Sequence, residues 1–307
     1  MKESKSLIPN KEWLPPNIEI KDVVSGDMPG DKVSIDETHT KRADRIFPYL
    51  LNSLQNTNDE KIVISVYGGS GVGKSEIGAL LGHYAKLEGF PAYVLSGDNY
   101  PFRIPSENDR ERLNIYRYEG LKALAEKNDF SDRWVNELKG LWETMEDANP
   151  ARTEGRPWFE LYQNRGKEAL YRYLGTEAEI DFPLINNILN RFKQGEAKIA
   201  LKRMGRTPDE LSFEAVDFSD IKLLIVEWTH GNNPSVEGVD IPLYLYSTPE
   251  ETLAHRLARG RDKGTDSPFI NIVLKIEQER LNSQINNAAL IVTKEGNIIK
   301  KDEINGR

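Results

Sequence analysis

The chain of 307 residues is long enough for one large domain or two ordinary ones. Its 41 basic and 49 acidic residues give a net charge of −8, which argues against nucleic acid as the main partner. It has no cysteine, which excludes disulfides, thiolate catalysis and cysteine metal sites. We expect a cytoplasmic protein that does not enter a membrane, because the sequence shows neither a signal-peptide core nor a run of ~20 apolar residues.

Residues 1–60 are predicted to form an N-terminal arm and a leading helix. The first 38 residues are polar and contain four prolines, so we expect an extended or loosely packed segment there. The stretch ETHTKRADRIFPYLLNSLQ then predicts a helix with Pro48 near its start or at a kink. Its apolar side is formed by Ile46, Tyr49, Leu50 and Leu54.

The segment KIVISVYGGSGVGKS, residues 61–75, combines a β-branched apolar run with a glycine-rich loop. It matches the G-x-x-x-x-G-K-[ST] phosphate-binding motif, from Gly68 to Ser75. A strand should precede this motif and a helix should follow it. EIGALLGHYAKLEG supplies the helix, since its apolar residues recur at helical spacing. The motif therefore predicts a nucleoside triphosphate site.

Each part of this motif has a chemical task. Glycines let successive backbone N–H groups turn inward around a phosphate, and the helix that starts near Lys74 adds its positive end. Lys74 supplies a mobile charge for the β- and γ-phosphates, and the Ser75 hydroxyl can ligate Mg²⁺. ATP and Mg²⁺ are thus the predicted cofactors. The predicted nucleotide-binding residues here are Gly69, Ser70, Gly71, Val72, Gly73, Lys74, Ser75 and Glu76.

FPAYVLSGDNYP predicts a second buried strand, residues 92–95, followed by a turn that carries Asp98 and Tyr100. The carboxyl ends of parallel strands form the active face of an open α/β sheet, so Asp98 is placed to meet a substrate. Residues from about 106 to 176 are strongly helical and are predicted to form an insertion. That insertion either takes part in substrate binding or packs on itself or on a second subunit, which leaves a homodimer open.

The next elements lead to a second candidate carboxylate. DFPLINNILNRFKQG predicts a helix, and KIALKRMGRTPDELSFEAV predicts a short hairpin. The run 221–226 predicts a central buried strand that ends in Glu227, where nucleotide enzymes of this kind place an acidic residue that orients Mg²⁺. A solvated strand end is the alternative interpretation of Glu227.

IPLYLYS predicts a further strand, and Thr248, Pro249 and Glu251 mark the start of the following helix. That helix and its end carry an arginine cluster, formed by Arg256, Arg259 and Arg261. Such a cluster can neutralise a transferring phosphoryl group, or it can be a solvated basic face. AALIVT is predicted to be the last strand, at an edge of the sheet.

The order of these parts resembles the uridine kinase and phosphoribulokinase-like family of P-loop kinases, over roughly residues 61–102 and 178–292. The segments that carry the resemblance are GGSGVGKS, Asp98-Asn99-Tyr100, Asp181-Phe182, Val226-Glu227-Trp228 and the arginines from Arg256 to Arg261. Trp228 stands where the family usually has glycine. The resemblance implies an α/β P-loop kinase, a parallel β-sheet flanked by helices, over residues 61–307 with the insertion at about 106–176.

The resemblance also implies a phosphotransferase that passes the γ-phosphate of ATP to a hydroxyl of a polar metabolite, such as a nucleoside or a sugar. In such kinases the aspartate after the second strand accepts the hydroxyl proton, which makes Asp98 the candidate base. Lys74 and Arg259 are the other predicted catalytic residues, and Arg256 and Arg261 are predicted to contact the nucleotide. Ser75 and Glu227 are the predicted Mg²⁺ ligands. The predicted acceptor-binding residues are Tyr100, Arg103, Asp181 and Trp228.

Two alternatives remain at this point. SGDNYPFRIPSENDRERLN, residues 96–114, resembles a stretch of adenylylsulfate kinases, whose acceptor is a ribose hydroxyl. A regulatory ATPase, in which hydrolysis moves the insertion against a partner, belongs to a different class. ATP hydrolysis that is independent of any acceptor would favour that switch.

Overall fold

The computed structural model describes residues 7–31, 33–127, 131–259 and 267–304. The chain divides into two compact units. We call them the sheet unit, which comprises Met1–Tyr100, Asp181–Thr248 and Arg280–Arg307, and the helical unit, which comprises Pro101–Ile180 and Pro249–Glu279. Within the described ranges, no helix is both long enough and apolar enough to cross a membrane.

The sheet unit is built on a six-stranded sheet in the order β2-β5-β1-β6-β7-β8. The strands are β1 (Ile62–Gly68), β2 (Ala92–Ser96), β5 (Leu223–Glu227), β6 (Ile241–Leu245), β7 (Leu290–Val292) and β8 (Ile298–Ile299). All neighbours pair in parallel except β7 and β8. This sheet confirms the predicted α/β fold. The prediction that AALIVT forms the edge was wrong, because Ile298 and Ile299 return after a tight turn and pair outside β7.

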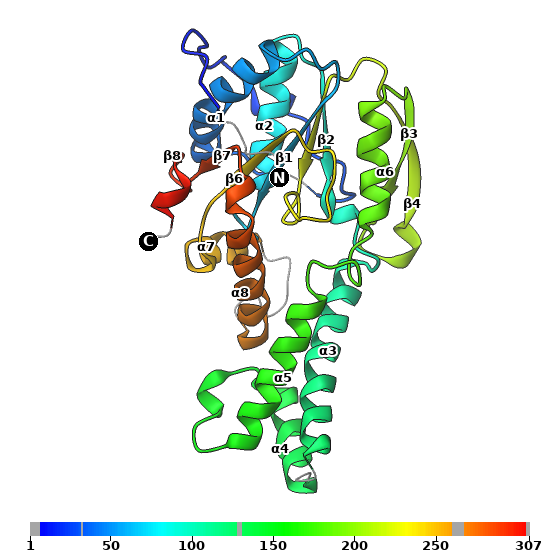
Figure 1. The fold of residues 1–307 in the computed structure, drawn as a ribbon, viewed down its shortest axis with the longest axis vertical. Helices are drawn as coiled ribbons and strands as arrows, with labels where there is room; N and C mark the ends of the chain where they lie inside the picture. The colour runs from blue at the N-terminus through cyan, green and yellow to red at the C-terminus, as the bar shows by residue number, and fades with distance from the viewer. Residues whose placement is uncertain (1–6, 32, 128–130, 260–266, 305–307) are drawn as a thin grey trace. The chain divides into compact units, whose positions relative to one another are not determined.

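Helices cover both faces of this sheet because the strands are apolar on both sides. Alternate residues of β1, such as Ile64 and Val66, pack with α1 (Glu37–Gln55) and α2 (Lys74–Leu87), which lie side by side in Figure 1. On the other face Tyr67 stacks on Tyr244. The predicted helix α6 (Phe182–Lys193) packs beside the predicted hairpin of β3 (Lys198–Arg203) and β4 (Ser212–Asp217) (Figure 1). Short 3₁₀ turns are η1 (Ile20–Asp22), η2 (Gly97–Asn99), η4 (Pro208–Glu210), η5 (Ile285–Asn287) and η6 (Lys301–Glu303).

The segment before α1 is extended, as predicted, but it is not loosely packed. Trp13 lies against Phe47 and Tyr84, with ring centroids 5.0 and 5.6 Å apart. Val23 and Met28 are buried. Only the expected loose packing was wrong, because these few apolar side chains, spaced among prolines and charges, each pack on the sheet unit. Pro48 lies inside α1 rather than at its start.

The helical unit contains α3 (Pro105–Glu126), α4 (Asp132–Glu143), η3 (Pro150–Arg152), α5 (Pro157–Tyr173), α7 (Pro249–Arg259) and most of α8 (Pro268–Ser283). Its core joins Tyr116 and Tyr162, from α3 and α5, to Phe269 of α8. The predicted helices of residues 106–176 are therefore present. They share their unit with Pro249–Glu279, which sequence analysis placed in the kinase domain.

Candidate functional site

The loop between β1 and α2 has the geometry that the phosphate-binding motif predicts. A Cβ at Gly68 would lie 2.4 Å from the carbonyl oxygen of Leu245, so that position needs a glycine. Gly73 precedes α2 with φ of +92°, in the left-handed region that glycine adopts readily. Lys74 is the first residue of α2. The loop thus delivers backbone N–H groups and the positive end of a helix to one place.

Lys74 folds back over this loop. Its Nζ donates a hydrogen bond to the carbonyl oxygen of Gly69, with the two atoms 3.0 Å apart. The bond spans the turn that the motif glycines form. A bound phosphate would take the place of this carbonyl as the partner of the ammonium group.

Ser75 and Glu227, the two predicted Mg²⁺ ligands, are in direct contact. The Ser75 hydroxyl donates to Oε2 of Glu227 at 3.1 Å, and β5 places Glu227 opposite Val66 of β1. Glu227 is only 4 % exposed. Burial, and then the charge of Asp98, raise the pKa of Glu227 to about 8, while Lys74 acts in the opposite direction.

This pair suits Mg²⁺. A hydroxyl and a carboxylate are hard oxygen donors, and Mg²⁺ normally completes its shell with water and substrate phosphates. Within the described part of the chain, no cluster of three or more His, Asp or Glu side chains could hold a metal by itself. A cation at this pair would favour the charged form of the buried Glu227, whose ionisation burial otherwise opposes.

Asp98 lies in η2, directly after β2, and its side chain is exposed. Because β2 pairs with β5 in register, with Ser96 opposite Glu227, the turn that carries Asp98 lies beside the end of β5. The effect of Asp98 on the pKa of Glu227 reflects the same proximity. Three neighbouring strands, β2, β5 and β1, therefore bring Asp98, Glu227 and the phosphate-binding loop to one edge of the sheet.

Two of the three predicted acceptor-binding residues of the sheet unit are buried. Trp228 and Tyr100 are 1 % and 0 % exposed. Trp228 packs on Gly97, and its ring centroid lies 5.9 Å from that of Phe182. These packing contacts explain why a large side chain stands at this position. Asp181 caps α6, where its Oδ1 accepts a hydrogen bond from the Leu184 N–H.

The remaining predicted site residues belong to the helical unit. Arg103 donates to the hydroxyl of Tyr173 at 2.9 Å. Arg256 is 8 % exposed and donates to the Pro249 carbonyl and the Thr252 hydroxyl, and burial lowers its pKa. These bonds hold Arg256 within its own helix.

Arg259 ends α7, but its side chain is outside the described residues, and so is the whole of Arg261. Acceptor binding by Tyr100, Arg103, Asp181 and Trp228, and phosphate binding by the arginines, stay predictions.

Sequence analysis missed a buried arginine under the phosphate-binding loop. Arg42, 3 % exposed, donates to the Val72 carbonyl at 2.7 Å and to the Val292 carbonyl at 3.2 Å. Burial lowers its pKa to about 10. The sequence did contain an indication that Arg42 is buried. Arg42, Ile46 and Leu50 are spaced by four residues, so Arg42 lies on the apolar side of α1, one helical turn before Ile46.

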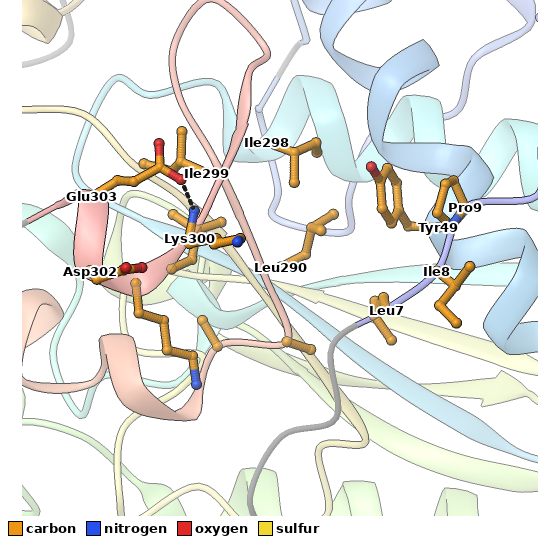
Figure 2. A pocket seen from close by; sticks show the side chains of 14 residues that line it. Leu7, Ile8, Pro9, Tyr49, Leu290, Ile298, Ile299, Lys300, Asp302 and Glu303 are labelled. Atoms are coloured by element: carbon orange, nitrogen blue, oxygen red, sulfur yellow. Dashed lines mark hydrogen bonds between the residues drawn. The ribbon is translucent and has the colours of Figure 1, made fainter.

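One cavity of about 700 Å³ in the sheet unit lies away from this site (Figure 2). Pro9 and Tyr49 lie on one side of it, and Lys300 and Glu303 lie on the other. No residue of the phosphate-binding loop, β2 or β5 lines it. It is therefore separate from the candidate active site.

Fold and site together define the class of the protein, which is an α/β protein with a phosphate-binding loop between β1 and α2. No protein-family model matches the chain. It is 36 % identical, over 264 residues, to the bifunctional alpha-galactosidase/sucrose kinase AgaSK of Mediterraneibacter gnavus. The match covers 86 % of this chain, and the chain spans 23 % of the length of that protein.

Several solved structures of kinases are similar at low identity. A possible uridine kinase from Bacillus stearothermophilus is 15 % identical, with 82 % of this chain and 97 % of that chain covered and a TM-score of 0.45. D-glycerate 3-kinase from Cryptococcus neoformans is 14 % identical, with 87 % and 99 % covered and a TM-score of 0.46. A putative fructose transport system kinase from Silicibacter sp. TM1040 is 14 % identical, with 81 % and 91 % covered and a TM-score of 0.43.

Proposed function

We propose that the protein is an ATP-dependent kinase that transfers the γ-phosphate to a hydroxyl of a sugar-like metabolite. The observation that supports this most is the meeting of Lys74, Ser75, Glu227 and Asp98 at the carboxyl ends of three adjacent strands. The first three suit a Mg·nucleotide, and Asp98 supplies an exposed carboxylate beside them. The site thus contains candidate residues for binding the phosphoryl donor and a candidate residue for the acceptor hydroxyl.

In the proposed reaction each residue of the site has a separate role in phosphoryl transfer. The backbone of residues 69–75 binds the phosphates, and Lys74 neutralises their charge. Ser75 and Glu227 would hold Mg²⁺, which supplies charge neutralisation on the transferred group. Asp98 orients the acceptor hydroxyl and takes its proton as the new O–P bond forms and ADP leaves. Arg259 and Arg261 are candidates to neutralise the same group.

The curated relative supports a sugar as the acceptor. Its match covers 264 of the 307 residues, so it necessarily includes the phosphate-binding loop and Glu227. Of the two activities in that protein's name, only the kinase activity needs a loop that binds a nucleoside triphosphate. Sucrose is therefore the first acceptor to test. A sugar also matches a site edge that presents charged groups rather than an apolar surface.

The test is ADP release from Mg·ATP with sucrose, other sugars, nucleosides, glycerate and adenylylsulfate, and with Lys74→Ala as the blank. We expect saturable, acceptor-dependent ADP formation with a sugar, and a loss of roughly 10² or more in the variant because its phosphate charge is unmatched. Adenylylsulfate as the sole acceptor would favour the adenylylsulfate kinase alternative. ADP formation that is indifferent to every acceptor would favour the regulatory ATPase.

A further inference from the structure

A carboxylate from the N-terminal segment lies under the turn that carries Asp98. Asp27 Oδ1 accepts a hydrogen bond from the backbone N–H of Ser96 at 2.7 Å and from the Asn99 side-chain amide at 3.1 Å. Its Oδ2 accepts from the Tyr93 hydroxyl at 3.0 Å. Asp27 therefore bonds the last residue of β2 and the last residue of η2, on either side of Asp98.

Asp27 is itself fixed by a buried ion pair. Arg203 Nη1 lies 2.7 Å from Asp27 Oδ2, and the two side chains are only 10 % and 8 % exposed. Arg203 also donates to the Tyr93 hydroxyl and to Glu214. The pair therefore ties the N-terminal segment to β2 and to the β3–β4 hairpin.

The far end of the turn has a second anchor. Asn99 is fully buried, and its side-chain oxygen accepts a hydrogen bond from the Met204 N–H at 2.9 Å. The Asn99 amide thus connects Asp27 to the residue that follows β3. A side chain with both ends of its amide engaged has no room to rotate, so Asn99 transmits the position of Asp27 to the turn.

The same segment also reaches Glu227. A Cβ at Gly26 would lie 3.6 Å from Oε1 of Glu227. The backbone before Asp27 therefore packs next to the carboxylate that the Mg²⁺ site would use. One short stretch of chain lies close to both acidic residues of the site.

We propose that Asp27 is a positioning residue that fixes Asp98 for the acceptor hydroxyl. The inference rests on the proposed kinase function. Asp27 would not touch either substrate, because it is buried behind the turn. Its role would be to keep Asp98 at one place relative to the phosphate-binding loop, where a displacement of about 1 Å can lower turnover by roughly 10².

The test compares Asp27→Asn with a matched control, Asp31→Asn. Asp31 belongs to the same segment and pairs with Arg206, next to the same hairpin. We expect Asp27→Asn to lower kcat by about 10 to 10², with the KM for Mg·ATP changed by less than about threefold. Asp31→Asn should keep the wild-type kcat. Equal kcat values for two folded variants would overturn the inference.

A double variant separates positioning from a loss of stability. If Asp27 acts through Asp98, Asp27→Asn should have almost no further effect on kcat in an Asp98→Asn background. An undiminished effect there would contradict the inference. Asn99→Ala breaks the same link without leaving a buried charge unpaired, so it replaces Asp27→Asn in both comparisons if that variant does not fold.

A readout without turnover distinguishes this inference from the proposed function. The Tyr100 N–H donates to the Gly97 carbonyl across η2, at 3.0 Å. Hydrogen exchange of this amide should accelerate in Asp27→Asn and stay unchanged in Asp31→Asn. Unchanged exchange in both would show that Asp27 does not hold the turn. Acceptor-independent ADP formation by the wild-type protein would instead contradict the kinase function.

Discussion

Trp228 stands where the kinase motif that Val226-Glu227-Trp228 resembles usually has glycine. Gly97 provides the space for its ring. A Cβ at Gly97 would lie 2.0 Å from Cγ and 2.4 Å from Cβ of Trp228. The two residues follow neighbouring strands, so the glycine of one strand end compensates for the tryptophan of the other. The ring in turn packs under the turn that carries Asp98.

We expect Gly97→Ala to lower the free energy of unfolding by about 1 to 3 kcal/mol, the usual range for overpacking. Trp228→Ala should lower it by about 3 to 5 kcal/mol through the cavity that it leaves. In the Trp228→Ala background the cost of alanine at position 97 should be smaller but not zero, because the ring is gone while the Cβ of residue 228 stays 2.4 Å away. Urea denaturation of the four proteins measures this coupling, and additive effects would disprove the steric explanation.

The site residues that sequence predicted are those with fixed spacing along the chain. Lys74 and Ser75 follow from one local motif, and Glu227 follows from a strand that ends in a carboxylate. Asp27 and Arg42 act across long sequence separations, through hydrogen bonds to Ser96 and Val72. No local pattern records such contacts, because the partners meet only in the folded chain.

Helix α1 begins at a well-formed cap. The Asp36 carboxylate accepts hydrogen bonds from the N–H groups of Thr38 and His39. Although burial acts in the opposite direction, hydrogen bonds from Thr38 and His39 lower the pKa of Asp36 to about 2. The stability that ionised Asp36 contributes is thus present above its ordinary pKa and is lost as the pH falls towards 2.

Asp36→Ala should therefore lower the free energy of unfolding by about 1 kcal/mol at pH 7, and by less at pH 3. Asp36→Asn, which keeps an acceptor oxygen without the charge, should have a smaller effect at pH 7, and that effect should also shrink at pH 3 because the titrating group is absent from this variant too. Urea denaturation at both pH values is the measurement. A loss in Asp36→Ala that is the same at pH 3 and pH 7 would contradict the role of the charge.

Helices α3 and α5 approach closely through two glycines. A Cβ at Gly120 would lie 2.5 Å from the ring of Tyr162, and a Cβ at Gly166 would lie 2.7 Å from the ring of Tyr116. In both cases a backbone carbonyl oxygen lies almost as close. The two rings meet edge to face at 5.8 Å. The contact is reciprocal, so each helix supplies a tyrosine to the gap in the other.

Gly166→Ala should lower the free energy of unfolding by about 1 to 3 kcal/mol, because a backbone carbonyl cannot swing away as a side chain can. Gly140→Ala in α4 is the control. A Cβ there has no neighbour within 4 Å, so the higher helix propensity of alanine should stabilise the protein by up to about 1 kcal/mol. Chemical denaturation followed by circular dichroism measures the free energy of unfolding of both variants. A change of the same sign in both would refute the packing argument.

Strands with several apolar residues were predicted well from sequence, and the shortest strand was not. β2, β5 and β6 each contain a run that periodicity can detect. β8 has only two residues, and its antiparallel pairing depends on the turn after β7. Two isoleucines do not define a period, so the true edge of the sheet could not be inferred.

The binding of Mg·ATP should stabilise the protein as a whole. A ligand at 100 times its Kd adds about 2.7 kcal/mol to the free energy of unfolding if it binds only the folded state. Lys74→Ala should lose most of this gain. Lys86→Ala, an exposed lysine near the other end of α2, should keep it. Thermal denaturation with and without Mg·ATP measures the gain, and equal gains in both variants would place the nucleotide elsewhere.

The organisation into two units was harder to predict than the elements themselves. Sequence analysis described residues 106–176 as one contiguous insertion. The helical unit also takes in Pro249–Glu279, because Phe269 and Ile272 pack with Tyr116 and Phe159. A helical pattern shows which face of a helix is apolar, but it does not show which distant segment covers that face.

The buried hydrogen bonds of Arg42 limit how far the protein can be truncated from its N-terminus. The recognisable motifs of the chain begin at residue 61, which suggests a minimal fragment that starts there. Such a fragment would lack the guanidinium that holds the Val72 carbonyl, and it would expose the surface of Tyr84 that Trp13 and Phe47 cover. A fragment that keeps all of these contacts must therefore start before Trp13, well upstream of every recognisable motif.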